Sequence, residues 1–409
     1  MLIILAISSV IVLIFEIIFL IVNASGMHWI FHILLLGYGI TGLIITIIKG
    51  VSNYRYNIKI EYENLGIKYL TGDGATKDYQ LAYNYFYKAS NYGSVEAKYR
   101  IGSMYDKGIG FKQNYNNAYK WYLSAANLGH AKAQNAVGNM LENGEGVKKD
   151  LVKALDWYIL AAEQGNEFAI ENIEGLKNKL DDEYFYQEGY NFYYGKDVIK
   201  DLNKAFVNFR RSAYLGCPEA IGFLADMYYE GEGVYVDYEK AFKYGLKSAE
   251  LGDKVSMNLL GVLYQYGYGV DKDLKKAFTW YTKAAEKGNN ISFLNIGDMY
   301  THGLYVKQDY EKAFDYYYAA AKNNFVLAYF EVGYCYYKGL GVTQSYEKAV
   351  YWFKKGAEQN EKNCEYGLGI CYFNGFGVTQ NNTLAKKYLD KASKKGNKNA
   401  RDTINKYDL

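Results

Sequence analysis

Apolar residues follow helical spacing along most of the chain after residue 60. In the stretch Leu260–Gly288, one apolar stripe keeps the i, i+3, i+4, i+7, i+8 spacing of a single helix face: Ala277, Trp280, Tyr281, Ala284 and Ala285. Gly267 and Gly269 interrupt the helix that precedes this stripe, and Asp273 is placed to cap the second helix. Gly288 is the residue type that ends a helix in the left-handed conformation. The stretch therefore predicts two helices joined by a turn.

The same skeleton occurs nine times. Each copy has a small residue in its first helix: Gly66, Gly102, Gly138, Gly189, Ala225, Gly261, Gly297, Gly333 and Gly369. Successive copies lie 36 residues apart, except that 15 extra residues separate the third from the fourth. A capping residue begins each second helix: Asp78, Asn114, Asp150, Asp201, Asp237, Asp273, Asp309, Ser345 and Asn381. A Gly or Asn ends it: Gly93, Gly129, Gly165, Gly216, Gly252, Gly288, Asn324, Asn360 and Gly396. One helix pair cannot bury both of its faces, so the copies are expected to stack on one another.

The pattern LGxxYxxGxGVxxDxxKAxxWYxKAAxxG resembles the Sel-one-like repeat, a relative of the tetratricopeptide repeat. The GxG turn, the double alanine and the period of 36 fit it better than the tetratricopeptide pattern, which has a period of about 34 and a late proline. The resemblance implies an all-α protein, an α/α superhelical solenoid of about nine helix-turn-helix repeats. Residues 62–165 hold repeats 1–3, and residues 182–397 hold repeats 4–9. Asp197 and Tyr305 replace the second turn glycine, and Asn208 replaces an aromatic residue, so we expect distorted turns there.

Small residues should allow the two helices of a repeat to pack closely. An alanine follows each cap by four residues: Ala82, Ala118, Ala154, Ala205, Ala241, Ala277, Ala313, Ala349 and Ala385. This alanine and the small residue of the first helix leave gaps that large aromatic side chains are expected to fill, namely Trp121, Trp157, Trp280 and Trp352.

The first 48 residues are predicted to form a two-span transmembrane hairpin. Residues 1–22 and 27–48 are apolar and long enough to cross a bilayer core, and a short polar break separates them. Lys49, Arg55 and Lys59 follow the second span, so the positive-inside rule places the repeats in the cytoplasm, after a connector at residues 49–61. The alternative is a signal peptide in residues 1–24 and an exported, surface-exposed or secreted repeat domain.

Folding the hairpin about residues 24–25 brings Glu16 level with His32. We hypothesise an intramembrane polar pair between them; a protonated Glu16 that faces a partner chain is the alternative.

Two further segments fall outside the repeats. Residues 166–181 form an insertion that begins like a first helix but has no GxG turn, which predicts an extra helix. It is either a degenerate repeat or a bend between two binding surfaces. The tail, residues 398–409, adds basic residues, which fit the polar outer face of a capping repeat better than contact with anionic lipid or nucleic acid.

Composition and motifs argue against several classes of function. The net charge is +3, from 47 Lys and Arg against 44 Asp and Glu, so no nucleic-acid partner is expected. The chain has four histidines and no HExxH, CxxC, P-loop or GxSxG pattern, so we expect no enzyme, no cofactor and no metal site. The four cysteines, Cys217, Cys335, Cys364 and Cys371, are expected to be unpaired, as suits a reducing compartment.

The variable stripe of the first helices is the candidate binding surface. It lies at positions −3, +1 and +4 from the small residue, where such solenoids line their groove. In repeats 4–9 its aromatic members gather at the two ends: Tyr186, Tyr190, Tyr193 and Tyr229, then Phe330, Tyr334, Tyr337, Tyr366 and Phe373. We hypothesise that they anchor an extended peptide or a partner helix. The alternatives are that these rings are half-buried packing, or that the groove holds the site of an enzyme or enzyme regulator.

Overall fold

A computed structural model describes residues 52–407, and every regular element in this part of the chain is a helix. The helices divide between two compact units, one ending at Glu171 and the other beginning at Asn172. The first unit holds a helix over residues 52–71, followed by α3 (Tyr79–Asn91), α4 (Val95–Lys107), α5 (Tyr115–Ala126), α6 (Ala131–Asn143) and α7 (Leu151–Glu163). Helix α8 (Glu167–Leu176) lies within the predicted insertion at residues 166–181 and contains the boundary between the units.

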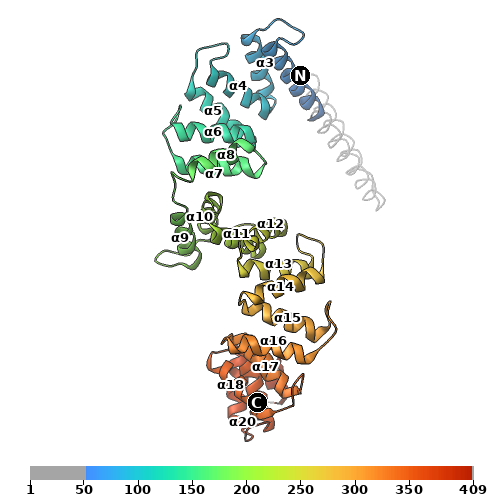
Figure 1. Ribbon diagram of the computed structural model, residues 1–409. Helices are drawn as coiled ribbons and strands as arrows, with labels where there is room; N and C mark the ends of the chain where they lie inside the picture. The colour runs from blue at the N-terminus through green and yellow to red at the C-terminus, as the bar shows by residue number, and fades with distance from the viewer. Residues whose placement is uncertain (1–51, 408–409) are drawn as a thin grey trace, which may run out of the picture. The chain divides into compact units, whose positions relative to one another are not determined.

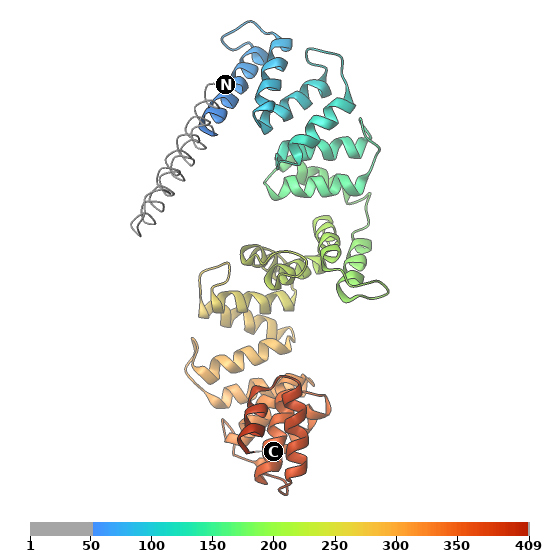
Figure 2. The ribbon, with the colours of Figure 1, turned by 180° about the vertical axis from the view of Figure 1, so that it is seen from behind.

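The second unit continues the alternation of first and second helices to the end of the described chain (Figures 1 and 2). Its helices are α9 (Asp182–Tyr194), α10 (Leu202–Leu215), α11 (Pro218–Glu230), α12 (Tyr238–Glu250), α13 (Lys254–Tyr266), α14 (Leu274–Glu286), α15 (Asn290–His302), α16 (Tyr310–Lys322), α17 (Val326–Lys338), α18 (Tyr346–Glu358), α19 (Lys362–Asn374), α20 (Asn382–Lys394) and α21 (Lys398–Tyr407). Each helix packs on the next in sequence, and the first helices also touch each other at α11–α13 and α17–α19.

The predicted caps of the second helices are confirmed in all nine repeats. Each capping side chain accepts a hydrogen bond from the backbone N–H three residues further on, as Asp273 does from Lys276 at 2.9 Å. This bond satisfies one of the N–H groups that the first turn of a helix leaves without a partner. The caps therefore fix where each second helix begins.

The predicted terminators also adopt the left-handed conformation, including Asn324 and Asn360 with φ of 58° and 62°. The expectation of distorted turns at Asp197 and Tyr305 is wrong. Both residues take the left-handed conformation of the glycines they replace, with φ of 60° and 64°. The turn therefore keeps its conformation in both repeats, and the strain of a non-glycine residue at positive φ falls on Asp197 and Tyr305.

The small residue of the first helix leaves no room for a larger side chain in most repeats. A ring from the second helix lies flat against it, 20 residues later in the chain. A Cβ added at Gly102, Gly138, Gly261 or Gly297 would lie closer than 3.0 Å to the ring of Tyr122, Tyr158, Tyr281 or Tyr317, respectively. The expectation that tryptophans fill these gaps is therefore wrong. Trp121, Trp157, Trp280 and Trp352 come one residue earlier, which turns their side chains by about 100° around the helix.

Repeat 5 reverses this arrangement. Its small residue is Ala225, and Gly245 stands where the other repeats carry a ring or, in repeat 9, Leu389. A Cβ on Gly245 would meet Leu260, Ala225 and Leu259 at 3.6–3.8 Å, which is ordinary van der Waals contact. In repeat 5 the methyl group is therefore on the first helix, at Ala225, and the position that carries a large side chain in the other repeats is the glycine Gly245.

The second turn glycine joins one repeat to the one before it. A Cβ on Gly233, Gly269, Gly341 or Gly377 would lie closer than 3.0 Å to a backbone carbonyl oxygen at the start of the preceding second helix. Backbone atoms cannot rotate away as side chains can, so this contact sets the spacing between repeats.

No helix within residues 52–407 is both long and apolar enough to cross a membrane. The two predicted spans, residues 1–22 and 27–48, and the predicted Glu16–His32 pair lie outside the described residues.

Candidate functional site

The predicted groove residues are brought together as two aromatic clusters within the second unit. Tyr186, Tyr190 and Tyr193 lie on α9, and Phe330, Tyr334 and Tyr337 lie on α17. Tyr366 and Phe373 follow on α19. All of them are half-buried except Tyr334, which is 38% exposed. Hollows in the surface adjoin both clusters, and the more polar middle of the stripe separates them.

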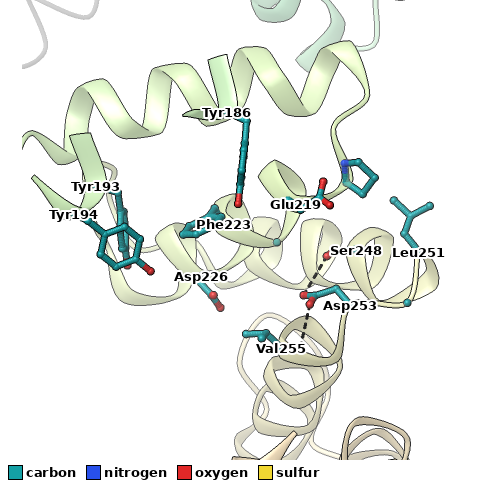
Figure 3. A pocket seen from close by; sticks show the side chains of 13 residues that line it. Tyr186, Tyr193, Tyr194, Glu219, Phe223, Asp226, Ser248, Leu251, Asp253 and Val255 are labelled. Carbon is teal, nitrogen blue, oxygen red and sulfur yellow. Dashed lines mark hydrogen bonds between the residues drawn. The ribbon is translucent and has the colours of Figure 1, made fainter. Parts of the chain in front are cut away.

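The first hollow, here called the Asp226 pocket, has a volume of about 530 Å³. Figure 3 shows Tyr186 reaching from α9 toward Phe223 on α11, with Tyr193, Tyr194 and Asp226 at one end. The remaining wall comes from α11, from the end of α12 and from the loop into α13: Pro218, Glu219, Gly222, Ser248, Leu251, Gly252, Asp253 and Val255.

Packing beneath the pocket holds its rings in place. Phe223 stacks on the buried Phe209, with ring centroids 4.4 Å apart and planes 11° apart. The rings of Tyr186 and Tyr193 also contact Phe223, with ring centroids 6.1 and 5.5 Å away, respectively. The hydroxyl of Tyr193 donates a hydrogen bond of 2.5 Å to Glu232. These contacts hold the rings of the aromatic wall in defined positions.

The lining of the Asp226 pocket carries negative charge and includes no lysine or arginine. Asp253 is already engaged, because it caps α13 through the backbone N–H of Ser256 at 2.8 Å. Asp226 has no hydrogen bond or ion pair to any described residue. Burial, with the like charges of Asp253, Glu230 and Glu232, raises the pKa of Asp226 to about 7. A hydrogen-bond donor or a cation in the pocket would stabilise the ionised form of the Asp226 carboxylate.

The other repeats show how such stripe residues are normally satisfied. In four repeats the ring on the second helix is a tyrosine, and its hydroxyl donates a hydrogen bond to the polar residue one or four positions after the small residue of the first helix. These bonds run from Tyr122 to Asp106 (3.2 Å), from Tyr158 to Asn139 (2.7 Å) and Glu142 (2.9 Å), from Tyr281 to Gln265 (2.9 Å) and from Tyr317 to Asp298 (2.6 Å). Where the ring is Phe209 or Phe353, both stripe positions are aromatic. The polar middle of the groove is thus explained by internal hydrogen bonds.

A second hollow, the Glu331 pocket, has a volume of about 490 Å³ and lies between α17 and α19. Its walls include five predicted or adjoining aromatic residues: Phe330, Tyr334, Tyr337, Phe353 and Tyr366. Burial, then the charges of Asp298 and Glu361, raises the pKa of Glu331 to about 7. Lys338 also lines this pocket, with its Nζ 5.4 Å from the ring centroid of Tyr337.

The last helix adds a third hollow beside the stripe. Helix α21 begins after Asn397, which caps it through Ala400 N–H at 2.9 Å, and it buries Ala400 completely. Tyr407 contacts Phe373 at 4.9 Å, and the two helices enclose a hollow of about 340 Å³. The segment predicted as a tail therefore takes the place of a first helix in a tenth repeat.

The Sel1 repeat model matches nine segments of the chain: residues 62–94, 95–130, 131–166, 186–217, 218–253, 254–289, 294–325, 326–361 and 363–397. The chain belongs to the Sel1 repeat family. The matches cover the nine predicted repeats and leave residues 167–185 between the third and the fourth.

Solved Sel1 repeat structures are similar to this chain. One is a protective antigen present in uropathogenic Escherichia coli strains, with 31% identity over 84% of this chain and 70% of that one, and a TM-score of 0.48. Another is a Sel1 repeat protein from Oxalobacter formigenes, with 30% identity over 67% of this chain and 99% of that one, and a TM-score of 0.33. No curated protein matches the chain.

Sequence reasoning located most, but not all, of the residues around the hollows in these Sel1 repeats. Tyr190 packs on Tyr194 at 4.6 Å and Tyr229 on Tyr238 at 5.9 Å, and neither lines any of the three hollows described above. Phe223, Glu331 and helix α21 were missed. One signal was available in the sequence: Gly245 breaks the series of large residues at its position, and so leaves Asp226 without a tyrosine.

Residues 52–407 hold no group of three or more His, Cys, Asp or Glu side chains placed to bind a metal ion. All four cysteines are free and buried, and burial raises the pKa of Cys335 and of Cys371 to about 12. Such thiols stay protonated and react slowly as nucleophiles.

Proposed function

We propose that this Sel1 repeat protein is a membrane-anchored scaffold. Its first-helix stripe in repeats 4–9 holds an extended peptide or a helix of partner proteins. The observation that carries the proposal is that hollows of about 530 and 490 Å³ adjoin the two aromatic ends of the stripe. Repeat proteins of this class offer long surfaces suited to protein partners.

The chemistry of the hollows supports a peptide ligand. Rigid, half-exposed tyrosine and phenylalanine side chains contribute large contact areas at low conformational cost and dominate interface energetics. The polar residues between the clusters, such as Asp298 and Gln265, already bond to Tyr317 and Tyr281. We therefore assign the anchoring of a ligand to the two ends of the stripe rather than to its middle.

The anchor is proposed from the sequence alone. Residues 1–48 would cross the bilayer twice, and the basic residues that follow would keep the repeats on the cytoplasmic side. Carbonate extraction of membranes and protease treatment of intact cells test this part. A protein that leaves the membrane in carbonate is not anchored, and repeats that are cleaved from outside are exported.

Partner binding is tested with a double variant of the Glu331 pocket, Tyr334→Ala with Tyr337→Ala. The control is Tyr235→Ala with Tyr351→Ala, two tyrosines that are 94% and 54% exposed and line none of the three hollows. Partners are identified by crosslinking in the native membrane followed by mass spectrometry. We expect defined partner proteins to be missing from the products of the Tyr334→Ala, Tyr337→Ala variant and to be retained by the control. Retention of every partner by a folded groove variant would refute the assignment of the groove.

A further inference from the structure

We propose that the Asp226 pocket receives an arginine side chain of the bound partner peptide. This inference rests on the proposed function and adds a chemical preference to it. The pocket lies in repeats 4–6, at the opposite end of the stripe from the Glu331 pocket.

The first argument is the missing tyrosine. Asp226 and Asp298 occupy the same position in repeats 5 and 7. Asp298 receives a hydrogen bond of 2.6 Å from Tyr317, whereas Gly245 stands in the place of that tyrosine in repeat 5. The donor that the fold supplies internally in repeat 7 must come from outside in repeat 5. A half-buried carboxylate without a hydrogen-bond donor lowers the stability of the fold. A ligand that supplies a donor removes this cost, and the free energy recovered adds to its binding affinity.

The second argument is charge. Three carboxylates line the pocket, Glu219, Asp226 and Asp253, and no basic side chain does. Two cations adjoin the lining from outside: the Nζ of Lys200 lies 5.5 Å from the ring centroid of Tyr193, and the Nζ of Lys287 would lie 3.5 Å from a Cβ built on Gly252. The charge of the lining itself therefore favours a cationic group over an acidic one.

The third argument separates arginine from other cations. The pocket is lined by the rings of Tyr186, Tyr193 and Phe223 as well as by carboxylates. A guanidinium group stacks on aromatic rings and donates several hydrogen bonds in one plane, whereas an ammonium group is a compact, strongly hydrated charge. The volume of about 530 Å³ has room for a whole arginine side chain and part of its backbone.

The Glu331 pocket lacks this combination and serves as an internal control. It also contains a half-buried carboxylate, but Lys338 lies in its wall and supplies positive charge. The second pocket therefore suits an apolar or aromatic anchor of the same peptide.

The test uses the full chain, purified in detergent, and two small probes, N-acetyl-arginine amide and its neutral analogue N-acetyl-citrulline amide. Binding is followed by NMR or by calorimetry. We expect saturable arginine binding with a Kd of about 1 mM, and binding of citrulline weaker by about tenfold or more. Asp226→Asn should weaken arginine binding by about tenfold, whereas Glu331→Gln should leave it unchanged. Ala225→Gly with Gly245→Tyr restores the pattern of repeat 7 and should also abolish binding.

The pH dependence adds a second readout. A bound cation favours the charged carboxylate, so arginine affinity should rise between pH 6 and pH 8, as Asp226 with its pKa of about 7 ionises. The titratable groups that face Asp226 or adjoin the pocket are Glu219, Glu230, Glu232, Asp253, Tyr186, Tyr193, Tyr194, Lys200 and Lys287. Asp226→Asn should remove most of this rise.

Several results would overturn the inference. They are equal binding of citrulline and arginine, tighter binding of N-acetyl-lysine amide, undiminished binding by Asp226→Asn, or no binding of arginine at all. Self-association that Asp226→Asn abolishes, without any effect of the probes, would assign the pocket to a second copy of the chain instead. If the inference fails while Tyr334→Ala with Tyr337→Ala still loses partners, the proposed scaffold function stands. If Asp226→Asn and the double variant Tyr334→Ala with Tyr337→Ala both leave partner binding intact, both the arginine pocket and the scaffold function are refuted.

Discussion

Replacing Gly261 with alanine adds one methyl group where α13 packs against the Tyr281 ring of α14. The new Cβ would lie closer than 3.0 Å to the ring of Tyr281, which is 1% exposed and donates a hydrogen bond of 2.9 Å to Gln265. Alanine in place of a mid-helix glycine gains about 1 kcal/mol of helix propensity. Overpacking costs about 1–3 kcal/mol, and displacing the hydroxyl from its partner costs about 1 kcal/mol more. We therefore expect Gly261→Ala to destabilise the fold by about 1–3 kcal/mol.

Gly245→Ala is the matched control, because it makes the same change in the middle of α12. Its Cβ would meet its nearest neighbours at 3.6–3.8 Å, so the propensity gain stands alone. We expect this variant to be more stable than the wild type by about 0.5–1 kcal/mol. Urea unfolding followed by far-UV circular dichroism measures both variants. Equal stabilisation by the two substitutions would refute the close packing of Gly261 on the tyrosine ring.

Three further predictions test other parts of the structure. Tyr317→Phe removes the donor to the Asp298 carboxylate and should cost about 1.5–3 kcal/mol in urea unfolding, whereas Tyr266→Phe, at a 56% exposed position, should cost almost nothing. Tyr305→Gly relieves a left-handed backbone at φ 64° but makes the unfolded chain more flexible, so a net gain of about 0.5 kcal/mol is expected; a loss would show that the tyrosine side chain matters more than the strain. The native pKa of Asp226 is raised to about 7 from 3.8, so the unfolded chain loses its proton first and this group lowers stability as pH rises from about 4 to 7. Asp226→Asn should therefore raise the melting temperature at pH 8 and change it little at pH 4, and a stabilisation equal at both values would contradict the raised pKa.

The local features of the fold could be predicted from the sequence, because each depends on one residue type in one backbone conformation. The caps at Asp273 and its counterparts and the terminators such as Gly288 follow directly from hydrogen bonding and from left-handed φ. The pairing of rings with small residues depends on the rotation of side chains about the helix axis. Neighbouring aromatic residues such as Trp280 and Tyr281 could not be told apart by spacing alone.

The candidate site was predictable only in part. The stripe positions pointed to Tyr186, Tyr193 and Tyr334, because helix periodicity fixes which residues share a face. The depth and enclosure of the hollows depend on contacts between separate helices and loops, and the sequence of a single helix does not specify these contacts. The roles of Leu251–Asp253 in one pocket and of α21 in another therefore required the structure.

The most direct test of the scaffold proposal is site-specific photo-crosslinking in the native membrane. Benzoylphenylalanine replaces Tyr334 in one variant and Tyr351, an exposed residue outside the three hollows, in another. We predict that position 334 crosslinks to one defined segment of a partner protein, that Tyr337→Ala in the same chain abolishes this product, and that position 351 gives none. Equal products from both positions, or products at 334 that Tyr337→Ala leaves unchanged, would contradict the proposal that the groove holds partner peptides.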